Sequence, residues 1–215
     1  MRGKIVRDPD TPAYENDEIT VDGKLIEAAQ KFYFAMNKPR GIVTTASDEK
    51  GRKTVMDLFR EQFAKLFPGK SVPHISPVGR LDAASEGLLL FTNDTQWADA
   101  LLDPRDSKAH IKIYRVQVAG KPSTAELEQM GKGFHVPPRV FGESGEFMHA
   151  ERAILHSEGE KNCWLEITLS EGKNREIRRM LAHLGYEVMR LVRIQFDKYT
   201  LGDLKPSEIQ KIQPN

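Results

Sequence analysis

The chain contains 215 residues, with 32 Lys or Arg and 31 Asp or Glu side chains that leave a net charge of +1. This length suffices for one sizeable catalytic domain and a small appendage. No apolar run approaches the roughly 20 residues of a membrane-spanning helix, and the first residues lack the apolar core of a signal peptide. These features exclude a transmembrane protein and predict a cytoplasmic one. The single cysteine, Cys163, cannot form a disulfide within the chain.

Charge is distributed unevenly along the chain. Residues 173–193 contain six Lys or Arg side chains and two acids, which gives a local charge of +4. Residues 8–27 contain seven acids and one Lys, which gives −6. A polyanion is attracted to clustered basic side chains. We therefore expect a polyanionic partner to meet the carboxy-terminal third of the chain.

The first 27 residues are polar and rich in turn formers. The dipeptide Asp22-Gly23 predicts a tight two-residue hairpin, but the segment has too few apolar residues for a core of its own. The pattern changes at residues 32–36, which read FYFAM and predict a buried strand, followed by a turn at residues 38–41. We therefore expect a small segment over residues 1–27 and a catalytic domain over residues 28–215.

The next elements place a polar loop ahead of an apolar strand. Residues 54–67 predict a helix with a capping signal from Thr54 and Asp57. Residues 87–92 read GLLLFT and predict an interior strand, after which a short helix starts at Thr95. Asp82 accordingly lies in the loop that leads into the interior strand.

The second half of the chain mixes strands with short helices. Strands are expected at residues 111–118, 164–169 and 188–194, and helices at 123–132 and 174–184. The alternation of residues 111–118 slips, which predicts a bulge near Tyr114. Because the elements lack a regular strand–helix–strand rhythm, the fold class expected is α+β with a mixed sheet.

Two polar clusters are candidates for chemistry. Residues 79–87, GRLDAASEG, stand directly before the most apolar strand, and residues 170–180, SEGKNREIRRM, place several cations at the start of a helix. Helix amino termini and Arg side chains both bind phosphates. The pattern alone leaves two other interpretations open, namely a surface turn with an Arg80–Asp82 ion pair and a solvated basic helix face.

The first cluster extends into a longer motif. Residues 79–89, with the pattern GRLDxxSEGLL, resemble the signature of the RsuA/RluB/RluE/RluF family of ribosomal RNA pseudouridine synthases. Three further segments follow in the family's order, at residues 38–41 (KPxG), 112–118 (KxYxVxV) and 171–180 (EGKNRxIRRM). The resemblance implies the pseudouridine synthase fold, a mixed and mostly antiparallel sheet with flanking helices and a central RNA-binding cleft.

The amino-terminal segment has a resemblance of its own. Residues 3–6 and 17–23 are similar to the second half of the small alpha-L RNA-binding domain that often precedes these enzymes. We expect residues 1–27 to be a remnant of that domain whose helical first half is missing.

The resemblance also implies the reaction and its residues. The expected activity is isomerisation of uridine to pseudouridine in ribosomal RNA, with the large subunit favoured, by cleavage of the C1′–N1 bond, rotation of the base and formation of a C5–C1′ bond. Asp82 is implied as the nucleophile, with Arg178 as the partner that orients it. Tyr114 is implied to stack on the base and to help move the proton lost from C5.

Other residues have supporting roles in this expectation. Leu191 resembles the family's apolar lid over the base, and core packing is an equally good interpretation. The basic side chains expected at RNA phosphates or in support of the site are Arg80, Lys38, Lys173, Arg175 and Arg179. Glu176 departs from the family, which more often has Gln there. The resemblance implies no metal or other cofactor, ribosomal RNA or a ribosome assembly intermediate as the partner, no membrane, and a monomer.

Two alternative functions have a basis in the same residues. A non-catalytic RNA-binding protein would account for the basic helix but not for the Asp82 cluster. A hydrolytic N-glycosidase would use Asp82 and Glu86 as an acid/base pair and would release free uracil.

Overall fold

The computed structural model describes residues 5–8, 10–14, 17–25, 30–45, 47–103, 110–138 and 144–214. The chain separates into two compact units, one ending at Lys31 and one beginning at Phe32. In the first unit, β1 (Thr20–Val21) and β2 (Lys24–Leu25) form the predicted hairpin. Asp22 and Gly23 have φ values of 51° and 77°, as a type I′ turn requires.

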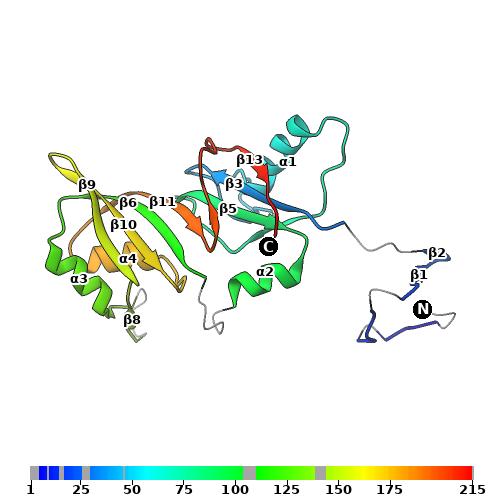
Figure 1. Cartoon of the computed structure of the whole chain (residues 1–215), viewed down its shortest axis with the longest axis horizontal. Coiled ribbons are helices and arrows are strands. Elements are labelled where there is room, and N and C mark those ends of the chain that lie inside the picture. The colour runs from blue at the N-terminus through cyan, green and yellow to red at the C-terminus, as the bar shows by residue number, and fades with distance from the viewer. Residues whose placement is uncertain are drawn as a thin grey trace. The chain divides into compact units, whose positions relative to one another are not determined.

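A nine-stranded sheet organises the second unit (Figure 1). Its main path is β13-β3-β5-β11-β6-β10-β9, with β4 added to β5 and β12 added to β11. The strands are β3 (Tyr33–Lys38), β4 (Ser76–Val78), β5 (Glu86–Thr92), β6 (Lys112–Ala119), β9 (Arg152–Glu158), β10 (Asn162–Leu169), β11 (Val188–Phe196), β12 (Tyr199–Thr200) and β13 (Ile209–Lys211). Only β5 and β11 pair in parallel among the described strands, so the sheet is mixed and mostly antiparallel, as predicted.

Four helices and a small ribbon accompany the sheet within the described ranges. The helices are α1 (Val55–Leu66), α2 (Thr95–Leu102), α3 (Thr124–Lys132) and α4 (Glu176–His183), and the ribbon consists of β7 (Phe134–Val136) and β8 (Glu146–Met148). The predicted capping box of α1 is present, because Thr54 Oγ1 accepts from the Asp57 N–H while Asp57 accepts from the Thr54 N–H. No helix of the described residues has the length and apolar character needed to cross a membrane.

Strand β5 is buried on both of its faces. Leu89 and Phe91 belong to a large core cluster that includes residues of α1, α3 and α4. Leu88 and Leu90 belong to a second cluster that includes Leu101 of α2. This double burial explains the uninterrupted apolar run of the strand, and it gives the loop before β5 a rigid anchor.

A bulge is present near Tyr114, but it lies on a different strand from the predicted one. Strand β6 pairs with β10 without interruption from Lys112 to Ala119. The extra residue lies on the neighbouring β11, where Arg193 is opposite Tyr114 and Gln195 is opposite Ile113. The apparent slip in the alternation arises because Ile111 lies outside β6 and is 38% exposed.

Candidate active site

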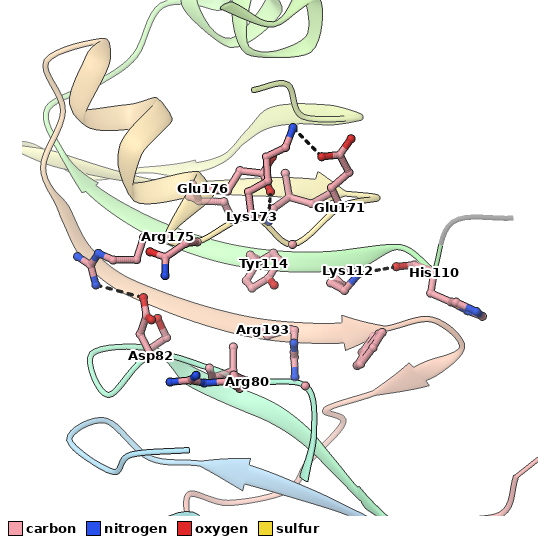
Figure 2. Close-up of a pocket in the computed structure, with 18 of the residues that line it drawn as sticks. Arg80, Asp82, His110, Lys112, Tyr114, Glu171, Lys173, Arg175, Glu176 and Arg193 are labelled. Carbon is pink, nitrogen blue, oxygen red and sulfur yellow. Dashed lines mark hydrogen bonds and ion pairs between the residues drawn. The ribbon is translucent and has the colours of Figure 1, made fainter. Parts of the chain in front are cut away.

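The described residues enclose a cavity of about 720 Å³ where the loop before β5 meets β6, β11 and the loop that leads into α4 (Figure 2). A volume of this size accommodates a nucleotide. Six predicted site residues line the cavity: Arg80, Asp82, Tyr114, Lys173, Arg175 and Leu191. Lys38, Arg178 and Arg179 do not line it, so the structure brings together most of the predicted set and places three members behind its walls.

Lys38 holds the loop that carries Asp82. Its side chain is fully buried and its Nζ donates to three backbone carbonyls, at 3.0 Å from Asp82 O, 2.7 Å from Ser85 O and 3.2 Å from Pro39 O. Burial lowers the pKa of Lys38 to about 8, although the nearby carboxylates of Asp82 and Glu86 favour its charged form. Of the two roles expected for Lys38, support of the site fits this position, and contact with an RNA phosphate does not.

Further backbone contacts fix the same loop. Thr44 Oγ1 donates to Leu81 O at 2.7 Å and accepts from Leu81 N at 3.3 Å, and Gly41 N donates to Ala83 O at 2.6 Å. The role of Thr44 was not expected from the sequence, because nothing in the local pattern separates this threonine from an ordinary strand residue. Together these contacts hold the backbone on both sides of Asp82.

The partner of the Asp82 carboxylate is Arg175. Arg175 Nη1 lies 3.1 Å from Asp82 Oδ2, and both side chains are a little over a third exposed (Figure 2). Arg175 precedes α4 and has a left-handed backbone, with φ of 53°. This conformation directs its side chain across the cavity rather than along the helix.

The predicted pairing of Arg178 with Asp82 is wrong. Arg178 donates to two backbone carbonyls instead, at 3.0 Å to Ala84 O and 3.1 Å to Val188 O. The helix begins at Glu176, after Arg175, so the two arginines do not share the stripe that a longer helix would have given them. Arg178 ties the Asp82 loop to the start of β11, and its charge still interacts with that of Asp82.

Tyr114 and Leu191 lie on the adjacent strands β6 and β11. They are 8% and 7% exposed, and both line the cavity. The Tyr114 hydroxyl interacts with the buried guanidinium of Arg193, which is directly opposite on β11. Leu191 also belongs to the large core cluster, so core packing accounts for part of its side chain.

Arg179 and Lys173 connect the region of the β7–β8 ribbon to α4 and to the loop before it. Arg179 Nη1 lies 2.7 Å from Glu146 Oε2, and its Nη2 lies 3.3 Å from Pro137 O. Lys173 Nζ donates to Phe147 O at 2.9 Å and pairs with Glu171 at 2.6 Å. Arg179 therefore acts within the fold, whereas Lys173 also lines the cavity.

Glu176 is buried at the cavity wall. Its Oε2 accepts from the Lys173 N–H at 3.1 Å, and burial raises the pKa of its carboxyl group. The extra carboxylate thus closes the turn before α4.

Lys112, Arg193 and Phe196 also line the cavity, and none of them was among the site residues expected from the sequence. Arg193 and Leu191 are two residues apart on β11, so their side chains point to the same face of the sheet. The other inward positions of this strand are apolar. A charged residue at such a position was the signal that could have identified it.

Glu86, the acid partner required by the N-glycosidase alternative, does not line the cavity. It forms a two-pronged ion pair with Arg190, with contacts of 3.1 and 2.8 Å. Asp82 and Glu86 therefore do not form the pair of carboxylates that hydrolysis of the glycosidic bond requires.

Comparisons with known proteins identify the family of the chain. The family model described as RNA pseudouridylate synthase matches residues 32–183. Ribosomal large subunit pseudouridine synthase B of Bacillus subtilis is 33% identical, over 100% of this chain and 82% of that protein. Ribosomal large subunit pseudouridine synthase E of Vibrio vulnificus is 32% identical, over 88% of this chain and 78% of that protein.

Solved structures extend the comparison to the fold. A crystal structure of a pseudouridylate synthase superimposes with a TM-score of 0.67 at 26% identity, and covers 98% of this chain and 83% of that one. The family model spans more than half of the chain and includes Asp82, Tyr114 and Arg175. The chain belongs to the RNA pseudouridylate synthase family.

Proposed function

We propose that this protein isomerises uridine to pseudouridine in ribosomal RNA of the large subunit. One observation carries the proposal: the carboxylate of Asp82 is held by Arg175 at a nucleotide-sized cavity in a chain of this family. Two of its relatives bear the names of ribosomal large subunit pseudouridine synthases.

Asp82 is the proposed nucleophile. The reaction breaks the C1′–N1 bond, turns the uracil and joins its C5 to C1′. A fixed carboxylate can attack a carbon of the nucleotide and leave again when the new bond forms. Arg175 orients the carboxylate by its charge and its hydrogen bond, and the contacts of Lys38 and Arg178 keep the loop in place.

Tyr114 and Leu191 provide the surfaces that hold the base. The Tyr114 ring stacks on the extruded uracil, and stacking of this kind contributes about 1 to 3 kcal/mol, comparable to the few kcal/mol needed to remove a base from a helix. Leu191 adds an apolar contact. Two flat or apolar surfaces without base-specific hydrogen bonds allow the detached uracil to rotate.

The cavity rim provides the proposed contacts to RNA. Arg80, Lys173 and Arg175 line the cavity and carry positive charge, and phosphates bind such side chains. We place the protein as a monomer in the cytoplasm, where RNA supplies the recognition surface. We also propose that residues 1–27 belong to an alpha-L type of RNA-binding segment.

The experiment that tests the function uses ribosomal RNA transcripts labelled with tritium at C5 of uridine. Isomerisation removes the C5 hydrogen, so tritium enters water while no free base appears. The Asp82→Asn variant should release none. Free uracil without pseudouridine would indicate a hydrolase, and no reaction with any ribosomal RNA would leave the binding-protein alternative in its place.

A further inference from the structure

Lys112 and Arg193 place two positive charges on the same aromatic ring in the cavity. The Arg193 guanidinium carbon lies 4.9 Å from the centre of the Phe196 ring, and Lys112 Nζ lies 5.1 Å from it. All three residues line the cavity that holds Asp82. In Figure 2, Tyr114 lies between Asp82 and Lys112, so Lys112 is on the other side of the tyrosine ring from the nucleophile.

Neither cation is neutralised by an ion pair within the described residues. Arg193 is 3% exposed, its Nε donates to Leu88 O at 2.8 Å, and its Nη2 meets no hydrogen-bond acceptor. Lys112 Nζ donates to His110 O at 3.1 Å and to Ser170 O at 3.4 Å. Burial lowers the pKa of both side chains because it removes water from their charges, and the charge of Arg193 lowers the pKa of Lys112 further.

Four carboxylates line the cavity, those of Asp82, Asp103, Glu171 and Glu176. Asp82 pairs with Arg175 and Glu171 pairs with Lys173. Glu176 interacts with Lys112 through space, but burial raises its pKa and its oxygen accepts from the Lys173 N–H. Lys112 and Arg193 therefore add two buried positive charges to this part of the cavity, and buried charges of this sign stabilise a ligand that becomes negative.

We propose that Lys112 and Arg193 stabilise the negative charge that uracil acquires when its bond to C1′ breaks. The inference rests on the function proposed above. When C1′–N1 breaks, its electron pair leaves with the base, and the charge spreads from N1 to the two carbonyl oxygens of uracil. The charge disappears again when C5 joins C1′, the C5 proton is lost and N1 takes up a proton.

Such a role differs from substrate binding. The neutral uridine gains little from the two cations, whereas the detached base gains much, so the interaction lowers the barrier rather than the dissociation constant. Preorganised charges of this kind commonly change kcat by about 100-fold or more. Arg193 also positions Tyr114, whose hydroxyl it contacts.

The test compares uridine with 5-fluorouridine at the target position of the RNA. Fluorine makes uracil a stronger acid, so its anion needs less help from the protein. The Arg193→Met and Lys112→Met variants should lose about 100-fold in the single-turnover rate with uridine, with little change in RNA affinity. Their loss of rate in consuming 5-fluorouridine should be clearly smaller. Arg193→Lys, which keeps the charge, should retain part of the rate.

Arg190→Met is the matched control, because Arg190 lies on the same strand but pairs with Glu86 outside the cavity. It should slow both substrates equally or not at all. Lys112 is less buried than Arg193, so its variant tests the idea if Arg193→Met fails to fold. Equal losses with the two substrates would overturn the inference while wild-type activity upholds the function. A wild type that forms no pseudouridine would reject both.

Discussion

Gly87 on β5 packs directly against the backbone of Arg193 on β11, at the parallel pairing of the two strands. A Cβ atom at Gly87 would lie only 2.7 Å from Arg193 N, and Gly87 has a φ of +101°. This contact links the motif loop that carries Asp82 to the strand that supplies Arg193 and Leu191. It gives a physical reason for glycine at the end of the GRLDxxSEG motif.

Gly87→Ala should therefore destabilise the fold by about 2 kcal/mol or more, through both the steric clash and the backbone strain. Gly185→Ala is a close control, since Gly185 has a φ of +89° but nothing within 4 Å of a Cβ. It should cost about 1 kcal/mol, from strain alone. Urea unfolding measures both values, and equal losses would contradict the close packing.

Arg175 and Arg178 should differ in what their removal changes. Arg175→Met should lower kcat strongly but cost at most about 1 kcal/mol of stability, because the Arg175–Asp82 pair is partly exposed. Arg178→Met should cost about 2 kcal/mol as well as activity, because it leaves two backbone carbonyls without their donor. Thermal unfolding and single-turnover rates of both variants check this. If Arg175→Met kept full activity, Arg175 would not orient the nucleophile.

Lys38 should impose a limit on activity at high pH. Its pKa falls from an ordinary value of 10.5 to about 8 in the fold. Above pH 8 the folded protein loses this proton, and with it one of the three N–H donors of Lys38, which hold the loop at Asp82 O and Ser85 O. Activity should fall through this window, and the fall should be missing from the residual activity of Lys38→Met.

The same loss of a proton from Lys38 affects folding in the opposite direction: activity falls as the pH rises, but stability increases. The folded state gives up the proton before the unfolded state does, so this group makes folding more favourable as the pH rises from 8 to 10.5. Loss of activity without loss of folding is thus expected near pH 8. If the activity of Lys38→Met declined with the same pKa, a group other than Lys38 would be responsible for the decline.

The sequence predicts the central elements well where local patterns decide them. The double burial of β5 is visible in its apolar run, and the Thr54–Asp57 cap and the Asp22-Gly23 turn have local causes. Strands β9 and β13 escape such an analysis. β9 lies at the sheet edge with few buried side chains, and β13 has only three residues, Ile209–Lys211, that depend on β3 for pairing.

The site shows the same division. Motif resemblance finds Asp82, but the choice between Arg175 and Arg178 depends on one backbone angle, the positive φ of Arg175. A non-glycine residue in this conformation is uncommon, and no sequence pattern marks it. Arg193 becomes a site residue only because β11 lies between β5 and β6 in the sheet, which is a long-range property of the fold.

The most direct test of the central claim is carbodiimide primer-extension mapping of pseudouridine in ribosomal RNA. Cells that lack the gene are complemented with the wild-type protein or with Asp82→Asn. One pseudouridine stop should vanish without the gene and return only with the wild type. A stop that returns with Asp82→Asn, or a pattern that never changes, would contradict the assignment of Asp82 as the nucleophile of a ribosomal RNA pseudouridine synthase.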